Sequence, residues 1–217
     1  ARKKQGWWIK MKRWLDPYSS VLDKLALIMD LIILNICFLL SSVLLFTVGA
    51  ALSAMYCTAY KLNDRSVNSV CKTFFAAFWD NLKRSTLVWI GVVLAGALVA
   101  VDILYIMQHC IPLYHPLGLA MLLVALLLGI VLTYAFPILA RFDCPLKNLL
   151  STCFSLFVLH LPTSLAAIAV NCLPLLLLWF VPRLFIQLGI VWVLLGFSTA
   201  AYINGKMFLK VFAKHGT

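Results

Sequence analysis

The chain has 217 residues, of which 64% are apolar and 12% are charged, and its mean hydropathy is +1.02. An ordinary soluble domain is about 45–50% apolar and about 25% charged, so the composition excludes soluble globular, disordered, collagen-like and disulfide-scaffold proteins. There are 18 Lys and Arg against 7 acids, a formal net charge of +11. We therefore predict an all-α, polytopic membrane helix bundle.

The first segment, residues 1–19, alternates cations with tryptophans and other apolar residues. Such a pattern is typical of a segment lying on the anionic cytoplasmic leaflet of a membrane. A basic arm for nucleic acid is the alternative that these residues allow, and we favour the membrane. The basic region is too long for a secretory signal peptide.

The first apolar run, from Leu25 to Tyr60, is far too long for one crossing, which needs about 20 residues. A break at residues 46–49, where Gly and β-branched residues interrupt a Leu-rich run, predicts a first span near 25–45 and a second near 49–62. The second is short and rich in Ala and Ser, which favours close helix packing. A full crossing and a re-entrant segment both remain open for it.

Four further apolar runs complete the predicted topology of six spans in three hairpins; they cover residues 87–107, 117–139, 165–181 and 184–203. With this layout, 17 of the 18 Lys and Arg lie on one side of the membrane and Arg183 alone lies on the other. Because short cationic loops stay in the cytoplasm, we expect both termini to be cytoplasmic. The predicted domains are an interfacial segment, one membrane domain and a short cytoplasmic tail, at residues 1–19, 20–210 and 211–217.

An amphipathic helix is predicted before the third span, at residues 70–84. At 100° per residue its aromatic and apolar side chains gather on one face and its polar ones on another. It would lie flat on the cytoplasmic surface, or dock into a groove of another protein. The candidate contact residues are Phe74, Phe75, Phe78, Leu82, Lys83 and Arg84. A comparable Phe-bearing segment, 147–163, precedes the last hairpin.

Polar side chains at membrane depth are the usual functional candidates in such a chain. Asp102 lies near the outer end of the third span, and Arg183 is the cation that could pair with it. A structural salt bridge, proton or substrate handling, and simple snorkelling are the three interpretations. Hydrogen bonds between helices are expected of five further polar residues, Asp30, Asn35, Asn171, Gln187 and Asn204.

The sequence gives little support to catalysis or metal binding. It contains no H-E-x-x-H, P-loop or G-x-S-x-G motif, and no Glu. Its seven Cys are scattered and form no C-x-x-C. His109, Cys110 and His115 fall in one short loop, where we expect polar loop residues rather than a metal site. We predict a protein that is not an enzyme and has no cofactor.

Several sequence features resemble the YesL family of bacterial integral membrane proteins of unknown function, in order and spacing over about residues 20–210. They are the run Gly49–Tyr56, the run Thr73–Phe75 with Phe78 and Asn81–Thr86, Asp102, and Tyr134–Pro137 with Ala140–Phe142. The resemblance implies a multi-pass protein of the bacterial cell (inner) membrane, often encoded beside carbohydrate ABC importers. It implies no catalytic residues.

Three functions follow as hypotheses. The first is a non-catalytic accessory or regulatory subunit of oligosaccharide ABC import, in contact with the importer's permease subunits through membrane helices or through residues 70–84. The second is an independent small-solute transporter or channel, lined by Asn35, Asp102, Asn171 and Gln187. The third is a membrane scaffold or sensor that uses the basic N-terminal segment.

Overall fold

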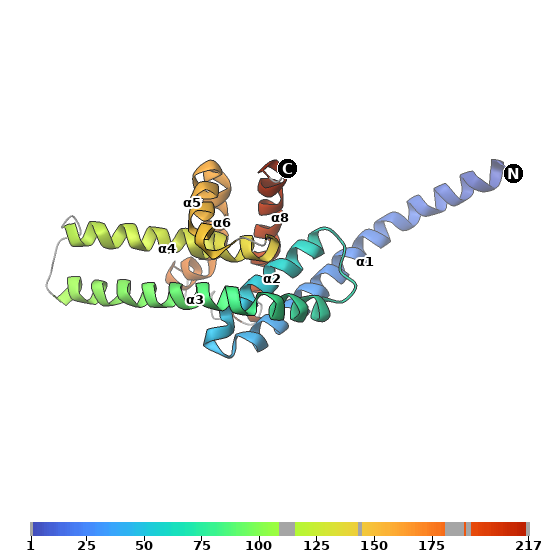
Figure 1. Cartoon of the computed structure of the whole chain (residues 1–217). Helices are drawn as coiled ribbons and strands as arrows, with labels where there is room; N and C mark the ends of the chain where they lie inside the picture. Colours follow the sequence, from blue (N-terminus) through green and yellow to red (C-terminus); the bar gives the residue numbers. More distant parts are fainter. Residues whose placement is uncertain (1, 109–115, 143–144, 181–188, 190–191, 216–217) are drawn as a thin grey trace.

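The computed structural model describes residues 2–108, 116–142, 145–180, 189 and 192–215, and in those residues the only regular structure is helical. Figure 1 shows the helices in chain order, with the N-terminal half of α1 extending away from the bundle. The elements are α1 (Arg2–Ser42), η1 (Leu45–Thr47), α2 (Val48–Asn63), α3 (Val70–Gln108), α4 (Pro116–Arg141), α5 (Leu146–Leu159), α6 (Leu161–Phe180), η2 (Trp192–Gly196) and α8 (Phe197–His215). The all-α class predicted from composition is confirmed.

The break between the first two apolar helices lies where the sequence places it. α1 ends at Ser42, a short 3₁₀ turn follows, and α2 begins at Val48. The last carbonyls of α1 have no partner within the helix. The Thr47 hydroxyl is 2.6 Å from the carbonyl oxygen of Ser41 and 2.7 Å from that of Leu44, so it donates to this pair. The threonine therefore closes the turn.

α2 ends in a Schellman motif. The Arg65 N–H donates to the Leu62 carbonyl at 3.2 Å, and the Ser66 N–H donates to the Lys61 carbonyl at 3.0 Å. Arg65 has a φ of 52°, the left-handed conformation that glycine usually provides at this position. The motif turns the chain from α2 towards α3.

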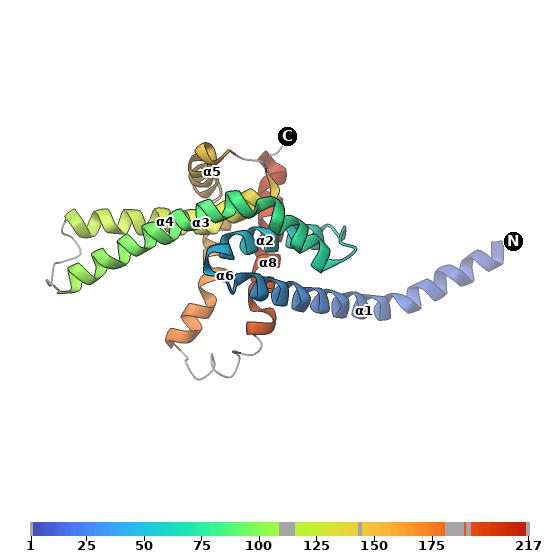
Figure 2. The ribbon, with the colours of Figure 1, turned by 60° about the horizontal axis from the view of Figure 1, so that its bottom comes forward.

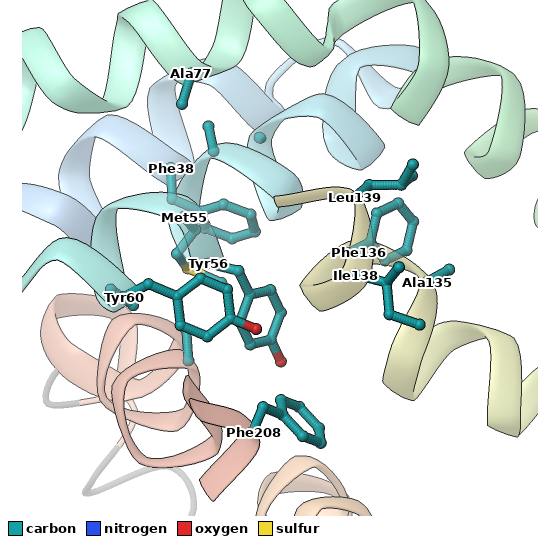
Figure 3. Close-up of a cluster of buried hydrophobic side chains, with 14 of the residues drawn as sticks. Phe38, Met55, Tyr56, Tyr60, Ala77, Ala135, Phe136, Ile138, Leu139 and Phe208 are labelled. Atoms are coloured by element: carbon teal, nitrogen blue, oxygen red, sulfur yellow. The ribbon is translucent and has the colours of Figure 1, made fainter. Parts of the chain in front are cut away.

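α2 is the shortest predicted span and also the centre of the bundle. Most of its side chains are buried, and small residues occur on several faces of the helix. α1, α3, α4 and α8 all pack against it. Figure 3 shows its aromatic residues Tyr56 and Tyr60 facing Phe136 of α4 and Phe208 of α8. Small residues let neighbouring backbones approach closely, so this helix organises the core.

α2 and α3 approach each other closely at Gly49. A Cβ atom added to Gly49 would lie 2.5 Å from the Ser85 carbonyl oxygen and 2.5 Å from the Trp89 Cβ. Both obstacles are at or next to the backbone and cannot swing away. The Trp89 indole N–H also donates to the Leu45 carbonyl at 2.8 Å, which fastens the α1–α2 turn to α3.

α3 corrects one expectation from the sequence. It is a single unbroken helix of 39 residues, about 58 Å long, so residues 70–84 are not a separate helix lying flat beside the third span. Its first half packs against α1 and α2. Residues 90–108, about 28 Å of helix, extend beyond the Trp89 contact and pack along α4. Residues 70–90 contain no Gly and no Pro, so nothing interrupts the helix at Ser85 and Thr86.

The last helices run in a different direction. In Figures 1 and 2 the α3–α4 pair is crossed steeply by α6 and α8. α5 and α6 meet at 105°. A π-helical turn, η2, precedes α8. The first, fourth and fifth predicted spans correspond to α1, α4 and α6, whereas residues 181–188 and 190–191 of the last predicted hairpin lie outside the described residues.

Three described helices are long and apolar enough to cross a membrane. They are Val21–Ser42, Val70–Ile106 and Gly118–Arg141, and the bent α5–α6 pair would be a fourth if it acts as one span. α2 has 16 residues, about 24 Å, which is shorter than a hydrocarbon core of about 30 Å. Several such helices indicate a multi-pass membrane protein, while the count of six stays a prediction.

Because the space around Gly49 is filled, adding even one methyl group there should destabilise the fold. We expect Gly49→Ala to lower the free energy of unfolding by about 1–3 kcal/mol, the range for overpacking a close-packed contact. Gly96→Ala is the matched control, because a Cβ there meets nothing within 4 Å. Thermal unfolding in mild detergent measures both, and an equal melting temperature for the two variants would contradict the contact.

Candidate functional site

Asn35 of α1 lies in the protein interior, with no exposed surface. Its Oδ1 accepts a hydrogen bond from the Ser198 backbone N–H at 3.0 Å. Ser198 follows the π-helical turn η2, and such turns disturb the regular pairing of backbone groups. The side chain therefore supplies a bond between α1 and α8, which is the interhelical role expected from the sequence.

Asn171 of α6 and Asn204 of α8 form a second polar contact. The Asn204 Nδ2 donates to the Asn171 Oδ1 at 2.9 Å. The Tyr56 hydroxyl of α2 faces the same Asn204 side chain. Asn171 and Tyr56 also line a small cavity of about 120 Å³ whose other walls are mostly apolar. The hydrogen bond joins α6 to α8, and Tyr56 brings α2 against the same cavity.

The other polar residues predicted to form a site do not lie beside the Asn171–Asn204 contact among the residues that the structure describes. Asp102 is exposed near the end of α3, in the segment that extends beyond the bundle with α4. Arg183 and Gln187 lie outside the described residues, so the Asp102–Arg183 pair stays a prediction. Of the polar candidates, Asn35 forms a hydrogen bond with α8, and Asn171 forms one with Asn204, which the sequence also predicts to bond between helices.

The aromatic segment of α3 divides its side chains between two environments. Phe74 and Phe78 are buried and stack on each other with ring centroids 6.3 Å apart. Phe75 is 41% exposed and Trp79 is 67% exposed. Leu82 is half-buried, and Lys83 and Arg84 are exposed. The residues predicted as one contact face therefore split into a core half and an outer half.

An exposed stripe of α3 was missed at the sequence level. Leu87, Gly91, Leu94, Leu98 and Val101 are spaced alternately by four and three residues, the repeat of helix–helix seams. All five are exposed, Leu98 at 69%. The signal was present in the sequence, but uniform hydrophobicity of the span hid it. We call these five residues the α3 stripe.

Two tyrosine contacts were also missed. The Tyr60 hydroxyl donates to the Pro137 carbonyl at 3.2 Å, and the Arg141 guanidinium lies 5.8 Å from the Tyr60 ring centre. The Tyr134 and Ser164 hydroxyls share a hydrogen bond of 2.5 Å, and Ser164 lies directly after the α5–α6 bend. These contacts join α4 to α2 and to α6, and long-range pairs of this kind carry no local sequence signal.

Within the described ranges, no three His, Cys, Asp or Glu side chains are grouped so as to hold a metal ion. The His109, Cys110 and His115 loop lies outside those ranges. Two thiols do approach each other, since the Cys37 and Cys71 Sγ atoms are 3.6 Å apart. They join α1 to α3.

Loss of the Asn35 acceptor should destabilise the bundle. Asn35→Ala leaves the buried Ser198 N–H without its partner, which costs about 1–3 kcal/mol. Asn81→Ala is the control, because Asn81 is half-buried and donates within its own helix, to the Ala77 carbonyl. Melting temperatures in detergent test the pair. A melting temperature of Asn35→Ala no lower than that of Asn81→Ala would contradict the role of this bond.

Comparison with known proteins finds one sequence family. Residues 31–103 match DUF624, a family of proteins of unknown function. The matched region runs from α1 through η1 and α2 into α3, so it includes the Gly49 contact and the α3 stripe. No curated protein and no solved structure matches the chain. The first three helices are thus similar to a family whose function has not been described.

Proposed function

We propose that this chain is a non-catalytic accessory or regulatory subunit of the bacterial cell membrane, associated with oligosaccharide ABC import. The similarity to DUF624 is consistent with the YesL resemblance, and that resemblance supports the association with importers. The chain would bind the permease subunits through its own helices. The α3 stripe is the observation that supports this proposal most directly.

The α3 stripe is apolar, regular and left uncovered by the described helices. In the most apolar segment of α3, only 6% of the residues are buried within the bundle, whereas 33% are buried in the corresponding segment of α4. Gly91 lies at its centre, and a Cβ there meets nothing within 4 Å. A small residue within such a repeat lets the backbone of a second helix approach closely. The stripe therefore suits a transmembrane helix of a permease.

The polar residues favour a subunit over an independent transporter. A transport pathway needs polar groups that converge on a hydrated cavity. Asn35 and Asn171 instead form hydrogen bonds with α8, and Asp102 lies apart from both near the end of α3. A scaffold or sensor would differ from an importer subunit mainly in the protein that it binds. The α3 stripe could bind that protein in the same way.

Docking through the stripe predicts that a bulky residue at Gly91 weakens permease binding. In Gly91→Leu the protein folds normally, since the space around Gly91 is open, yet a partner helix is pushed away. Gly129→Leu is the matched control, because an added Cβ at Gly129 of α4 also meets nothing within 4 Å and this residue lies off the stripe. We expect a loss of at least about tenfold for Gly91→Leu, equal to about 1.4 kcal/mol.

Affinity purification from native membranes in mild detergent, followed by quantification of co-purified importer permease and ATPase subunits, measures this loss. Retention of the permease by Gly129→Leu and its loss from Gly91→Leu would support the proposal. A tagged wild-type chain that recovers no importer subunit would refute it.

The charge distribution predicts that both ends of the chain face the cytoplasm. A single cysteine placed at Thr217 of a cysteine-free variant should resist a membrane-impermeant maleimide in intact cells and react after the membrane is permeabilised. The same substitution at Gln5 should behave alike. Reaction of either position in intact cells would overturn the predicted orientation.

A further inference from the structure

We propose that the groove between the end of α1 and the first half of α3 binds one anionic glycerophospholipid, whose headgroup phosphate pairs with Lys83. The groove has a volume of about 760 Å³. α3 contributes one wall, from Phe75 to Ile90, and the end of α1 with η1 contributes the other. This site shares Leu87 with the α3 stripe, and its other lining residues lie outside the proposed permease contact.

The shape and lining of the groove suit hydrocarbon chains. Below Lys83 it extends along α3 to Ile90, about 10 Å, which is about two thirds of the depth of one leaflet, half of a hydrocarbon core of about 30 Å. Leu40 and Leu44 form the opposite wall. Leu44 is 56% exposed and Trp79 is 67% exposed. The apolar lining of the groove is exposed at the protein surface. Within a bilayer, lipid acyl chains would therefore cover it.

One charged side chain lies on this apolar lining, and its sign selects the headgroup. Lys83 is the single charged residue among those that line the groove. It is exposed and follows Trp79 by one helical turn, which is the pairing of Trp and Lys common at the membrane–water interface. An ammonium group at this level attracts a phosphate, and the overall charge of +11 favours anionic lipids further.

A hydroxyl group next to Lys83 points to the same ligand. The Thr58 and Thr73 hydroxyls each donate to the backbone carbonyl four residues earlier. The Thr86 Oγ1 is buried and has no hydrogen-bond partner among the residues that the structure describes, although Thr86 lines the groove. A buried hydroxyl without a partner is unfavourable. In the proposed complex the Thr86 side chain rotates towards the groove, where the ester carbonyl of a glycerolipid supplies an acceptor at the depth below the phosphate.

The test measures lipid selectivity of the full chain. Protein purified in mild detergent is mixed with equal amounts of phosphatidylglycerol and phosphatidylcholine, and retained lipid is counted by native mass spectrometry. We expect one phosphatidylglycerol to be retained preferentially. Lys83→Gln should reduce that preference about fivefold, the equivalent of about 1 kcal/mol for one cation near an anionic surface. Thr86→Val should weaken retention of both lipids.

The control is Lys72→Gln, which removes an exposed cation of the same helix outside the groove. It should leave the preference unchanged. Equal losses for Lys83→Gln and Lys72→Gln would show diffuse charge attraction and overturn the site, as would a wild-type protein without preference. As a second readout, a phosphatidylglycerol with a photoreactive acyl chain should crosslink residues 75–90, whereas crosslinks spread evenly over α3 and α4 would refute the site.

Discussion

The close approach of α2 to α3 at Gly49 is the constraint on which the rest of the bundle depends. It sets the distance between two helices at a point where no side chain fits, and the Trp89–Leu45 hydrogen bond fixes the α1–α2 turn at the same place. Because α1, α4 and α8 also pack on α2, the position of this helix decides where the others lie. The region that matches DUF624 includes the Gly49 contact. The sequence similarity to that family therefore covers the centre of the fold.

The polar groups of the interior reinforce that centre rather than form an open path. Asn35 bonds to α8, Asn171 bonds to α8 through Asn204, and Tyr60 bonds to α4. In an apolar surrounding each of these bonds is hard to replace with water, so each one specifies which helices are neighbours. Function is then expected on the outer surface, where the α3 stripe and the groove beside Lys83 lie on neighbouring parts of one helix.

Composition and hydropathy were sufficient to predict the helical class, the break near Thr47 and the ends of α2 and α4. They failed where three-dimensional packing decides. Residues 70–84 have an amphipathic pattern, but the helix continues into the apolar span because no residue at 85–86 ends it. The steep crossing of α6 and α8 over the α3–α4 pair also has no local signal. For the site, the pattern identified Asn35, Asn171 and Asn204 as residues that bond between helices, but it did not show that Asn171 pairs with Asn204 or Asn35 with Ser198, because these partners are far apart in sequence.

The length of α3 beyond Lys83 has a consequence for the lipid environment itself. From Lys83, which the proposed lipid site puts at the headgroup level, α3 continues for about 38 Å to Gln108, which is longer than a hydrocarbon core of about 30 Å, so the α3–α4 hairpin matches the bilayer only when it tilts. A thinner bilayer would tilt the hairpin further, and the rigid joint at Gly49 would carry that tilt into the whole bundle. Bilayer thickness is thereby a physical variable that sets the angle at which this protein meets its neighbours in the plane of the membrane.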